Sequence, residues 1–316
     1  METRHDTVLL HEAVDGLGIS TGEVVVDGTF GAGGHFRELA IALGKTGTLI
    51  GIDADQASFD RAQSLVDEIK AVGPTIHLVQ NNFRNLENIL DTLGISCIDK
   101  ALFDLGWNGH QLAEGRGFSF RTDEPLHMTY GNPDEGATAS DLVNSLKEEE
   151  LADLIYTYGE ERFSRGIAKA IVEMRRHKKI TTTALLAEAV MQGTPAWYHH
   201  RKLHPATKTF QALRIATNDE LGALREALSV CFSRLTQGGR VAVITFHSIE
   251  DRIVKSAFKE AAYAGEGSLI TRKPVVPSEE ELTRNPRARS AKLRIFERCK
   301  SERVCTGVTT SIAEYA

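Results

Sequence analysis

The chain has 316 residues, of which 41% are hydrophobic and 25% are charged, and its formal net charge at pH 7 is −6. A chain of this length and composition forms one large or two moderate globular domains with well-packed cores. No stretch approaches the roughly 20 apolar residues that a membrane-spanning helix requires, so the composition excludes an integral helical membrane protein.

The first predicted elements lie in the segment VVVDGTFGAGGHFRELA, residues 24–40. Its three valines are typical of a buried strand, which ends at Asp27. A turn with four glycines between residues 28 and 34 follows, and apolar residues then recur at helical spacing from Phe36. A strand, a glycine turn and a helix are how α/β proteins present a nucleotide-like ligand to a helix N-terminus.

Further apolar runs end in polar or glycine-bearing turns and predict parallel strands, with helical patterns at residues 55–72 and 84–93 between them. This alternation favours an α/β fold with a doubly wound, Rossmann-like sheet. Residues 290–298 alternate as a late edge strand would, and residues 265–288 predict a mobile loop. The parallel strands are expected at residues 23–28, 47–53, 75–82, 99–106 and 239–248.

Residues 110–214 interrupt this alternation. After a stretch that contains glycine and proline, at residues 115–136, the patterns are mostly helical. We therefore predict a discontinuous domain of residues 1–109 and 215–316, with a helical domain of residues 110–214 inserted between its fourth and fifth strands.

The glycine turn departs from the dinucleotide fingerprint G-x-G-x-x-G, because Phe36 occupies the third glycine position. A nicotinamide-dependent oxidoreductase is therefore only an alternative. Asp53 ends the second strand, 22 residues after Gly31, where a carboxylate can accept hydrogen bonds from ribose hydroxyls. A short glycine turn with acidic residues at two strand ends favours S-adenosylmethionine (SAM).

Two further strand ends support this prediction. Phe83 follows the third strand, where an aromatic ring can stack on adenine, and Asp104 ends the fourth. Ligands of doubly wound sheets bind at this carboxyl edge. For Asp27, contact with the methionine ammonium group and a structural cap are equally open.

Positive charge is concentrated in two segments of this acidic chain. Residues 161–210 contain ten Lys and Arg against three Asp and Glu, and residues 284–303 contain eight against two. This segregation predicts a surface that binds a polyanion. For either segment alone, a solvated helix face is the alternative.

The four cysteines, at positions 97, 231, 299 and 305, form no CxxC pair and no zinc spacing. The N-terminal sequence METRHDTVLL also lacks the apolar core of a signal peptide. We therefore expect reduced thiols in a cytoplasmic protein that has neither a metal site nor a membrane partner.

Several long motifs resemble those of one known family, the 16S rRNA (cytosine(1402)-N(4))-methyltransferases. They include DGTFGAGGH, YGEERFSRGIAKAIVE, HPATKTFQALRIATNDEL and GGRVAVITFHSIEDRIVK, and the similarity extends from about Thr7 to Arg298. The resemblance implies a class I SAM-dependent methyltransferase with an inserted helical domain. It implies methylation of the exocyclic amine of a cytidine in 16S rRNA of the small ribosomal subunit. By position, it also implies SAM contacts at Gly33, Gly34, His35, Asp53, Phe83, Asp104 and Gln111.

Methyl transfer to a cytosine amine needs precise alignment and an acceptor for the hydrogens of the amine. Asp104 and Asn108 are the candidate catalytic residues, although Asp104 also fits a role in positioning SAM. The target base must leave its stack, and Trp107 and Tyr130 are candidates to receive it. Candidate phosphate contacts come from the positive segments: Arg201, Lys202, Lys208, Arg287 and Arg289.

The sequence departs from the usual family residues close to this chemistry, at positions 107–109 and at His127, Thr129 and Tyr130. The target nucleotide and the catalytic residue therefore stay open. A non-catalytic ribosome-assembly factor that binds SAM and RNA is the alternative function, and the oligomeric state, a homodimer included, is also open.

Overall fold

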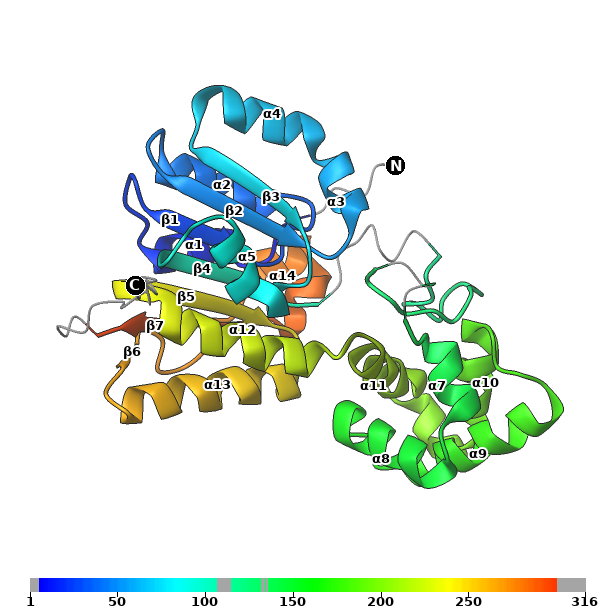
Figure 1. Ribbon diagram of the computed structural model, residues 1–316. Helices are drawn as coiled ribbons and strands as arrows, with labels where there is room; N and C mark the ends of the chain where they lie inside the picture. Colours follow the sequence, from blue (N-terminus) through cyan, green and yellow to red (C-terminus); the bar gives the residue numbers. More distant parts are fainter. Residues whose placement is uncertain (1–5, 107–114, 132–133, 135, 300–316) are drawn as a thin grey trace, which may run out of the picture. The chain divides into compact units, whose positions relative to one another are not determined.

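The computed structural model describes residues 6–106, 115–131, 134 and 136–299 (Figure 1). These residues divide into two compact units. The sheet unit contains the described residues up to Gly106 and from Ala223 onward, and the helical unit contains those between them.

The sheet unit is built on seven strands in the order β3-β2-β1-β4-β5-β7-β6. The first five strands of the chain pair in parallel, whereas β7 is antiparallel to both of its neighbours. The strands are β1 (Val24–Asp27), β2 (Thr48–Asp53), β3 (Thr75–Gln80), β4 (Ile98–Asp104), β5 (Leu235–Thr245), β6 (Gly267–Leu269) and β7 (Lys292–Arg298).

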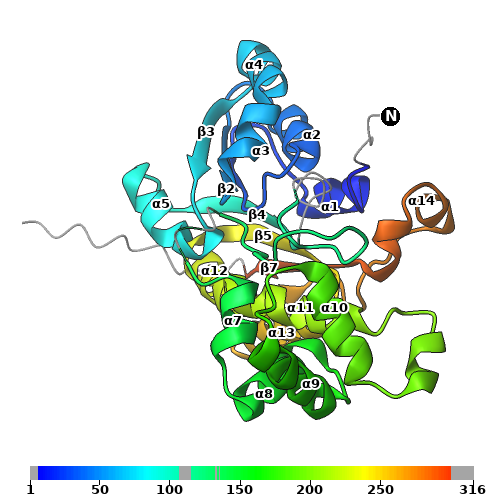
Figure 2. The same ribbon diagram turned by 90° about the vertical axis from the view of Figure 1, so that its right-hand side faces the viewer.

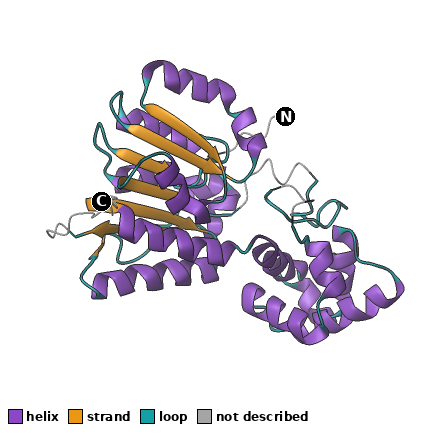
Figure 3. Cartoon of the chain, in the orientation of Figure 1, coloured by secondary structure: helices purple, strands orange, loops and turns teal. Residues whose placement is uncertain are grey.

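Helices cover both faces of this sheet (Figure 3). Val25 is buried in the core of one face and Val26 in the core of the other, which explains the continuous valine run. The helices α1 (Leu10–Leu17), α2 (Gly34–Leu43), α3 (Gln56–Arg61) and α4 (Gln63–Val72) contribute to the first core. The helices α5 (Leu86–Thr92), α12 (Glu220–Arg234) and α13 (Ser248–Tyr263) contribute to the second.

The five predicted parallel strands are confirmed, with some of their ends shifted. The helical pattern of residues 55–72 forms two helices, α3 and α4, which separate at Ala62. The predicted strand at residues 290–298 is confirmed as β7, but its predicted edge position is wrong because β6 pairs on its outer side. The predicted loop 265–288 contains β6, α14 (Glu279–Arg284) and the start of the 3-10 helix η4 (Pro286–Ser290).

The helical unit has a hydrophobic core of its own. Figure 2 shows its helices in green, in a view turned by 90° from that of Figure 1. Buried residues from each α-helix that the structure describes wholly within this unit, among them Val143, Leu151 and Ile167, meet in this core. No helix in the described part of the chain is both long and apolar enough to cross a membrane. The helices are α7 (Ala139–Ser145), α8 (Glu148–Gly159), α9 (Ser164–His177), α10 (Thr183–Gln192), α11 (Ala206–Asn218) and the 3-10 helix η3 (Ala196–His200).

Candidate functional site

Asp53 connects the end of β2 to the glycine turn after β1. Its Oδ2 accepts a hydrogen bond from the N–H of Gly31 at 2.8 Å, and its Oδ1 accepts one from the N–H of Asp55 at 2.8 Å. Burial raises the pKa of Asp53 above its ordinary value of 3.8, although these two N–H groups oppose the shift. Because each carboxylate oxygen has a second lone pair, Asp53 can also accept from hydroxyls of a ligand.

The glycine turn leads into α2 through two positions that require glycine. Gly33 has φ 78°, in the left-handed region, and a Cβ there would lie 2.7 Å from Cδ2 of Leu65. A Cβ at Gly34 would overlap the side chain of Thr7. The first N–H groups of a helix have no partner within the helix, so this end of α2 can bind electronegative ligand atoms.

Asp27 and Asp104 end the adjacent strands β1 and β4, and Thr29 connects them. The N–H of Thr29 donates to Oδ1 of Asp27 at 3.1 Å, and its Oγ1 accepts from the N–H of Asp104 at 2.6 Å. Oδ2 of Asp27 and Oδ1 of Asp104 are buried and have no hydrogen-bond partner among the described residues. Buried polar atoms without a partner are destabilising, so these two oxygens favour a ligand group that donates or carries positive charge.

The electrostatics at the carboxyl edge of the sheet favour binding of a cation. Burial raises the pKa of Asp27 from 3.8 to about 7, and the charge of Asp53 contributes to the rise. Burial also raises the pKa of Asp104 well above its ordinary value, and the charges of Asp27 and Glu250 raise it further. A positively charged ligand would stabilise the ionised carboxylates that burial and mutual repulsion disfavour.

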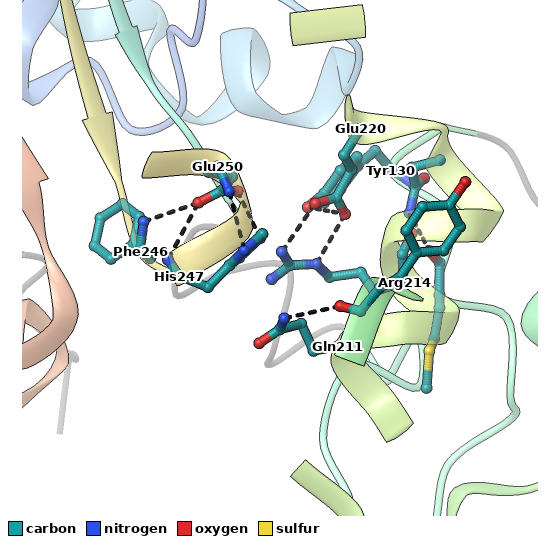
Figure 4. A network of polar contacts seen from close by, with 10 residues as sticks. Tyr130, Gln211, Arg214, Glu220, Phe246, His247 and Glu250 are labelled. Carbon is teal, nitrogen blue, oxygen red and sulfur yellow. Dashed lines mark hydrogen bonds and ion pairs between the residues drawn. The ribbon is translucent and has the colours of Figure 1, made fainter. Parts of the chain in front are cut away.

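Glu250 is held in place at the start of α13, directly after β5. Its Oε2 accepts from the N–H groups of Phe246 at 2.8 Å and His247 at 3.3 Å (Figure 4). Neither Glu250 nor Thr29 was predicted as a site residue. Glu250 had a usable signal, since an acid three residues after the N-cap His247 is the capping-box position. Thr29 had none.

His35 and Phe83 complete the described part of the site. His35 is the second residue of α2, is buried, and has Nδ1 at 3.6 Å from Oδ2 of Asp104. Phe83 follows β3, is partly buried, and packs edge-on against Phe103 with ring centroids 5.6 Å apart. The structure therefore brings His35 to Asp104 and Asp53 to the glycine turn, while Phe83 follows the next strand. The predicted contacts Trp107, Asn108 and Gln111 lie outside the described residues.

Tyr130, predicted to receive a base, has several partners within the helical unit (Figure 4). Its hydroxyl donates to Oε1 of Glu220 at 3.0 Å, and Arg214 donates to both oxygens of the same carboxylate at 2.8 and 2.9 Å. Its ring stacks on Phe118 with centroids 5.6 Å apart. These contacts fix the orientation of Tyr130.

The predicted phosphate contacts lie in both units. Arg201 and Lys202 are exposed in the helical unit, and Lys208 donates to the backbone oxygen of Glu160 at 2.7 Å. Arg287 and Arg289 are exposed on η4 of the sheet unit.

The strand order, the glycine turn and the acidic strand ends define a class I SAM-dependent methyltransferase. The residues present fit this cofactor. The oxygens of Asp27 and Asp104 that have no hydrogen-bond partner among the described residues suit its positive charge, and Asp53 suits its ribose hydroxyls.

Comparison with known proteins identifies the family. The chain matches the model of the MraW methylase family over residues 2–299 and belongs to this family. Three similar relatives are named Ribosomal RNA small subunit methyltransferase H. They come from Brevibacillus brevis (44% identity, 93% of this chain and 98% of the relative), Deinococcus radiodurans (46%, 93% and 89%) and Lactobacillus delbrueckii subsp. bulgaricus (44%, 94% and 100%). The predictions of fold class, family, methyltransferase activity and SAM as cofactor are confirmed, and the oxidoreductase alternative is excluded.

The first prediction concerns Asp53. Asp53→Ala removes an ionised acceptor for ribose hydroxyls, a contact worth about 1.5–3 kcal/mol. SAM affinity, measured by calorimetry, should therefore fall by about tenfold to a hundredfold. Asp60→Ala removes an exposed carboxylate of α3 and serves as the matched control, with native affinity expected. Native affinity in a folded Asp53→Ala variant would show that Asp53 does not hold the cofactor.

The second prediction concerns Asp27 and stability in the absence of ligand. Because folding raises the pKa of Asp27 from 3.8 to about 7, the native chain binds this proton more tightly than the unfolded chain does. The contribution of Asp27 to the free energy of unfolding therefore decreases as pH rises through this window. Asp27→Asn keeps the oxygen that accepts from Thr29 and removes the titration. We expect a higher Tm than that of the native protein at pH 8.

Thermal scans across the pH range measure this difference, which should vanish below pH 3.8, where both chains carry a neutral side chain. Asp60→Asn, on the exposed face of α3, should show no such trend. A difference in Tm that is the same at every pH would refute the raised pKa.

Proposed function

We propose that this enzyme methylates the exocyclic N4 amine of a cytidine in 16S rRNA, at the family position 1402. The observation that carries the proposal is the pair of buried carboxyl oxygens of Asp27 and Asp104 at the carboxyl edge of the sheet, which have no hydrogen-bond partner among the described residues. The names of the relatives support ribosomal RNA of the small subunit as the substrate class.

Each residue of the site has a role in this reaction. When bound, SAM supplies an electrophilic methyl group on a positively charged sulfur. Asp53 accepts hydrogen bonds from the ribose, and Asp27 holds positive charge near the end of β1. Both keep the cofactor in one orientation, which is what an in-line transfer requires.

Asp104 is the candidate for the substrate amine. A cytosine amine is a poor nucleophile, and it becomes positively charged as its new N–C bond forms. A carboxylate that accepts its hydrogens stabilises this charge and takes up the released proton. His35, 3.6 Å away, orients the Asp104 carboxyl group, and Asn108 is a second candidate for holding the amine.

We further propose that the helical unit is the substrate-recognition domain predicted for residues 110–214. The positive segment 161–210 lies in this unit, with Arg201 and Lys202 exposed on it. Together with Arg287 and Arg289 of the sheet unit, these side chains would bind phosphates of the RNA. We place the reaction in the cytoplasm, where ribosomal subunits are assembled.

The third prediction tests the reaction itself. Mass spectrometry of small-subunit rRNA should find no N4-methylcytidine at the target position in a strain that lacks the gene. The native gene should restore the modification. Asp104→Asn should slow methylation by about a hundredfold or more, with SAM affinity reduced by much less. Asp60→Asn is the control and should restore full methylation. Normal methylation in the deletion strain would refute the proposed substrate.

The fourth prediction concerns the phosphate contacts. Each contact that is removed should lower the slope of log affinity against log salt concentration by about 0.7 for single-stranded RNA. Replacing both Arg201 and Lys202 by alanine should therefore flatten the slope by about 1.4 and leave SAM affinity unchanged. Asp53→Ala is the reciprocal control, which should bind RNA normally and bind SAM weakly. If the double variant keeps the native slope, these two cations do not contact phosphates.

A further inference from the structure

A cluster of aromatic and arginine side chains connects two distant segments of the helical unit. Arg162 and Phe163 lie between α8 and α9, and Trp197 and Tyr198 lie in η3. The guanidinium carbon of Arg162 lies 4.7 Å from the ring centroid of Phe163 and 4.9 Å from that of Trp197. The Trp197 ring packs edge-to-face against Phe163 and Tyr198, with centroids 5.8 Å apart in both cases. We call these four residues the aromatic platform.

The aromatic platform is held in a fixed geometry by Glu161. This buried carboxylate accepts from the hydroxyl of Tyr198 at 2.7 Å and from the N–H of Phe163 at 2.9 Å. Arg201 adds a contact, with its guanidinium carbon 5.4 Å from the ring centroid of Tyr198. Since Glu161 is satisfied by these partners, its role is to position the rings.

Trp197 is nevertheless 55% exposed, in contrast to Tyr198, which is 5% exposed. A large aromatic side chain that has an arginine over its ring and still leaves about half of its surface in water is typical of a binding surface. Leu203, further along the chain, is also exposed, at 54%.

The charge around the aromatic platform identifies the kind of partner. No Asp or Glu occurs between Glu188 and Asp219 in the sequence. Arg162, Arg201 and Lys202 are all exposed, and none of them takes part in an ion pair among the described residues. An exposed indole next to the guanidinium of Arg162, in a segment with two further exposed cations, matches the surfaces on which unpaired bases stack while cations bind the neighbouring phosphates.

We propose that the aromatic platform binds single-stranded RNA by stacking an unpaired base on Trp197. Arg162 packs against the Trp197 ring on which the base stacks. Arg201 and Lys202 bind the adjacent phosphates. This inference rests on the proposed function, because it assigns a docking surface for the RNA substrate.

The fifth prediction uses the tryptophan content of the chain. The only two tryptophans are Trp107 and Trp197, so Trp107→Phe leaves Trp197 as the single indole fluorophore. Its emission should be quenched by a single-stranded oligouridylate and not by an RNA duplex of equal charge, whose bases are already stacked. In the otherwise native chain, Trp197→Ala should weaken binding of the oligouridylate by about fivefold to a hundredfold. The salt slope should be unchanged because no phosphate contact is lost.

Two matched variants complete the test. Trp197→Phe keeps an aromatic face and should recover most of the affinity. Tyr156→Ala removes another exposed ring of the helical unit, 62% exposed, and should have no effect. Native affinity in a folded Trp197→Ala variant, or equal quenching by the duplex, would overturn the inference. Stronger quenching by polyglutamate than by the oligouridylate would also overturn it and indicate a protein partner.

These outcomes are independent of the proposed function. Normal rRNA methylation together with unchanged oligouridylate binding by Trp197→Ala refutes the stacking surface alone. The proposed function fails instead if the deletion strain retains N4-methylcytidine at the target position, whatever the fluorescence shows.

Discussion

The carboxyl ends of neighbouring parallel strands must meet at one edge of a sheet, and in this protein two of them end in carboxylic acids, the buried Asp27 and the mostly buried Asp104. This constraint makes Asp27 and Asp104 neighbours, and Thr29 fixes their separation because it forms hydrogen bonds with both. The raised pKa values, the two oxygens without a hydrogen-bond partner among the described residues and the preference for a cationic ligand are all consequences of placing acids where little water reaches them. The glycine turn complements these acids, because it leaves the backbone beside them accessible to a ligand.

Strand ends were the part of the site that the sequence could predict. A run of apolar residues that is buried on both faces of a sheet must stop where the chain leaves the sheet, so the positions of Asp27, Asp53 and Asp104 could be predicted from the sequence alone. Thr29 could not be placed, because its position depends on the pairing of β1 and β4. The capping-box pattern places Glu250 at the start of α13, but its closeness to Asp104 depends on the pairing of β4 and β5. The edge position of β6 was missed for the same reason, since three residues carry no periodic signal and their pairing with β7 is not local.

In the helical unit, the sequence predicted the positive charge, but it did not predict which side chains contact one another. Counting charges identified the positive segment of residues 161–210, but the count could not show that Arg162 stacks on Trp197, 35 residues away. Similarly, the partner of the Tyr130 hydroxyl is Glu220, which is 90 residues distant. Side-chain contacts between segments far apart in the sequence depend on how those segments pack together, and a composition window contains no information about that packing.

The excess of buried carboxyl groups also bears on how the catalytic cycle ends. Methyl transfer converts the sulfonium of the cofactor into a neutral thioether, so the spent cofactor carries one positive charge fewer than the one that entered. In the proposed site, the repulsion among Asp27, Asp104 and Glu250 that a bound cation relieves would then be only partly compensated. The same acids would therefore hold the spent cofactor less tightly than SAM, which would favour its exchange for a new SAM molecule.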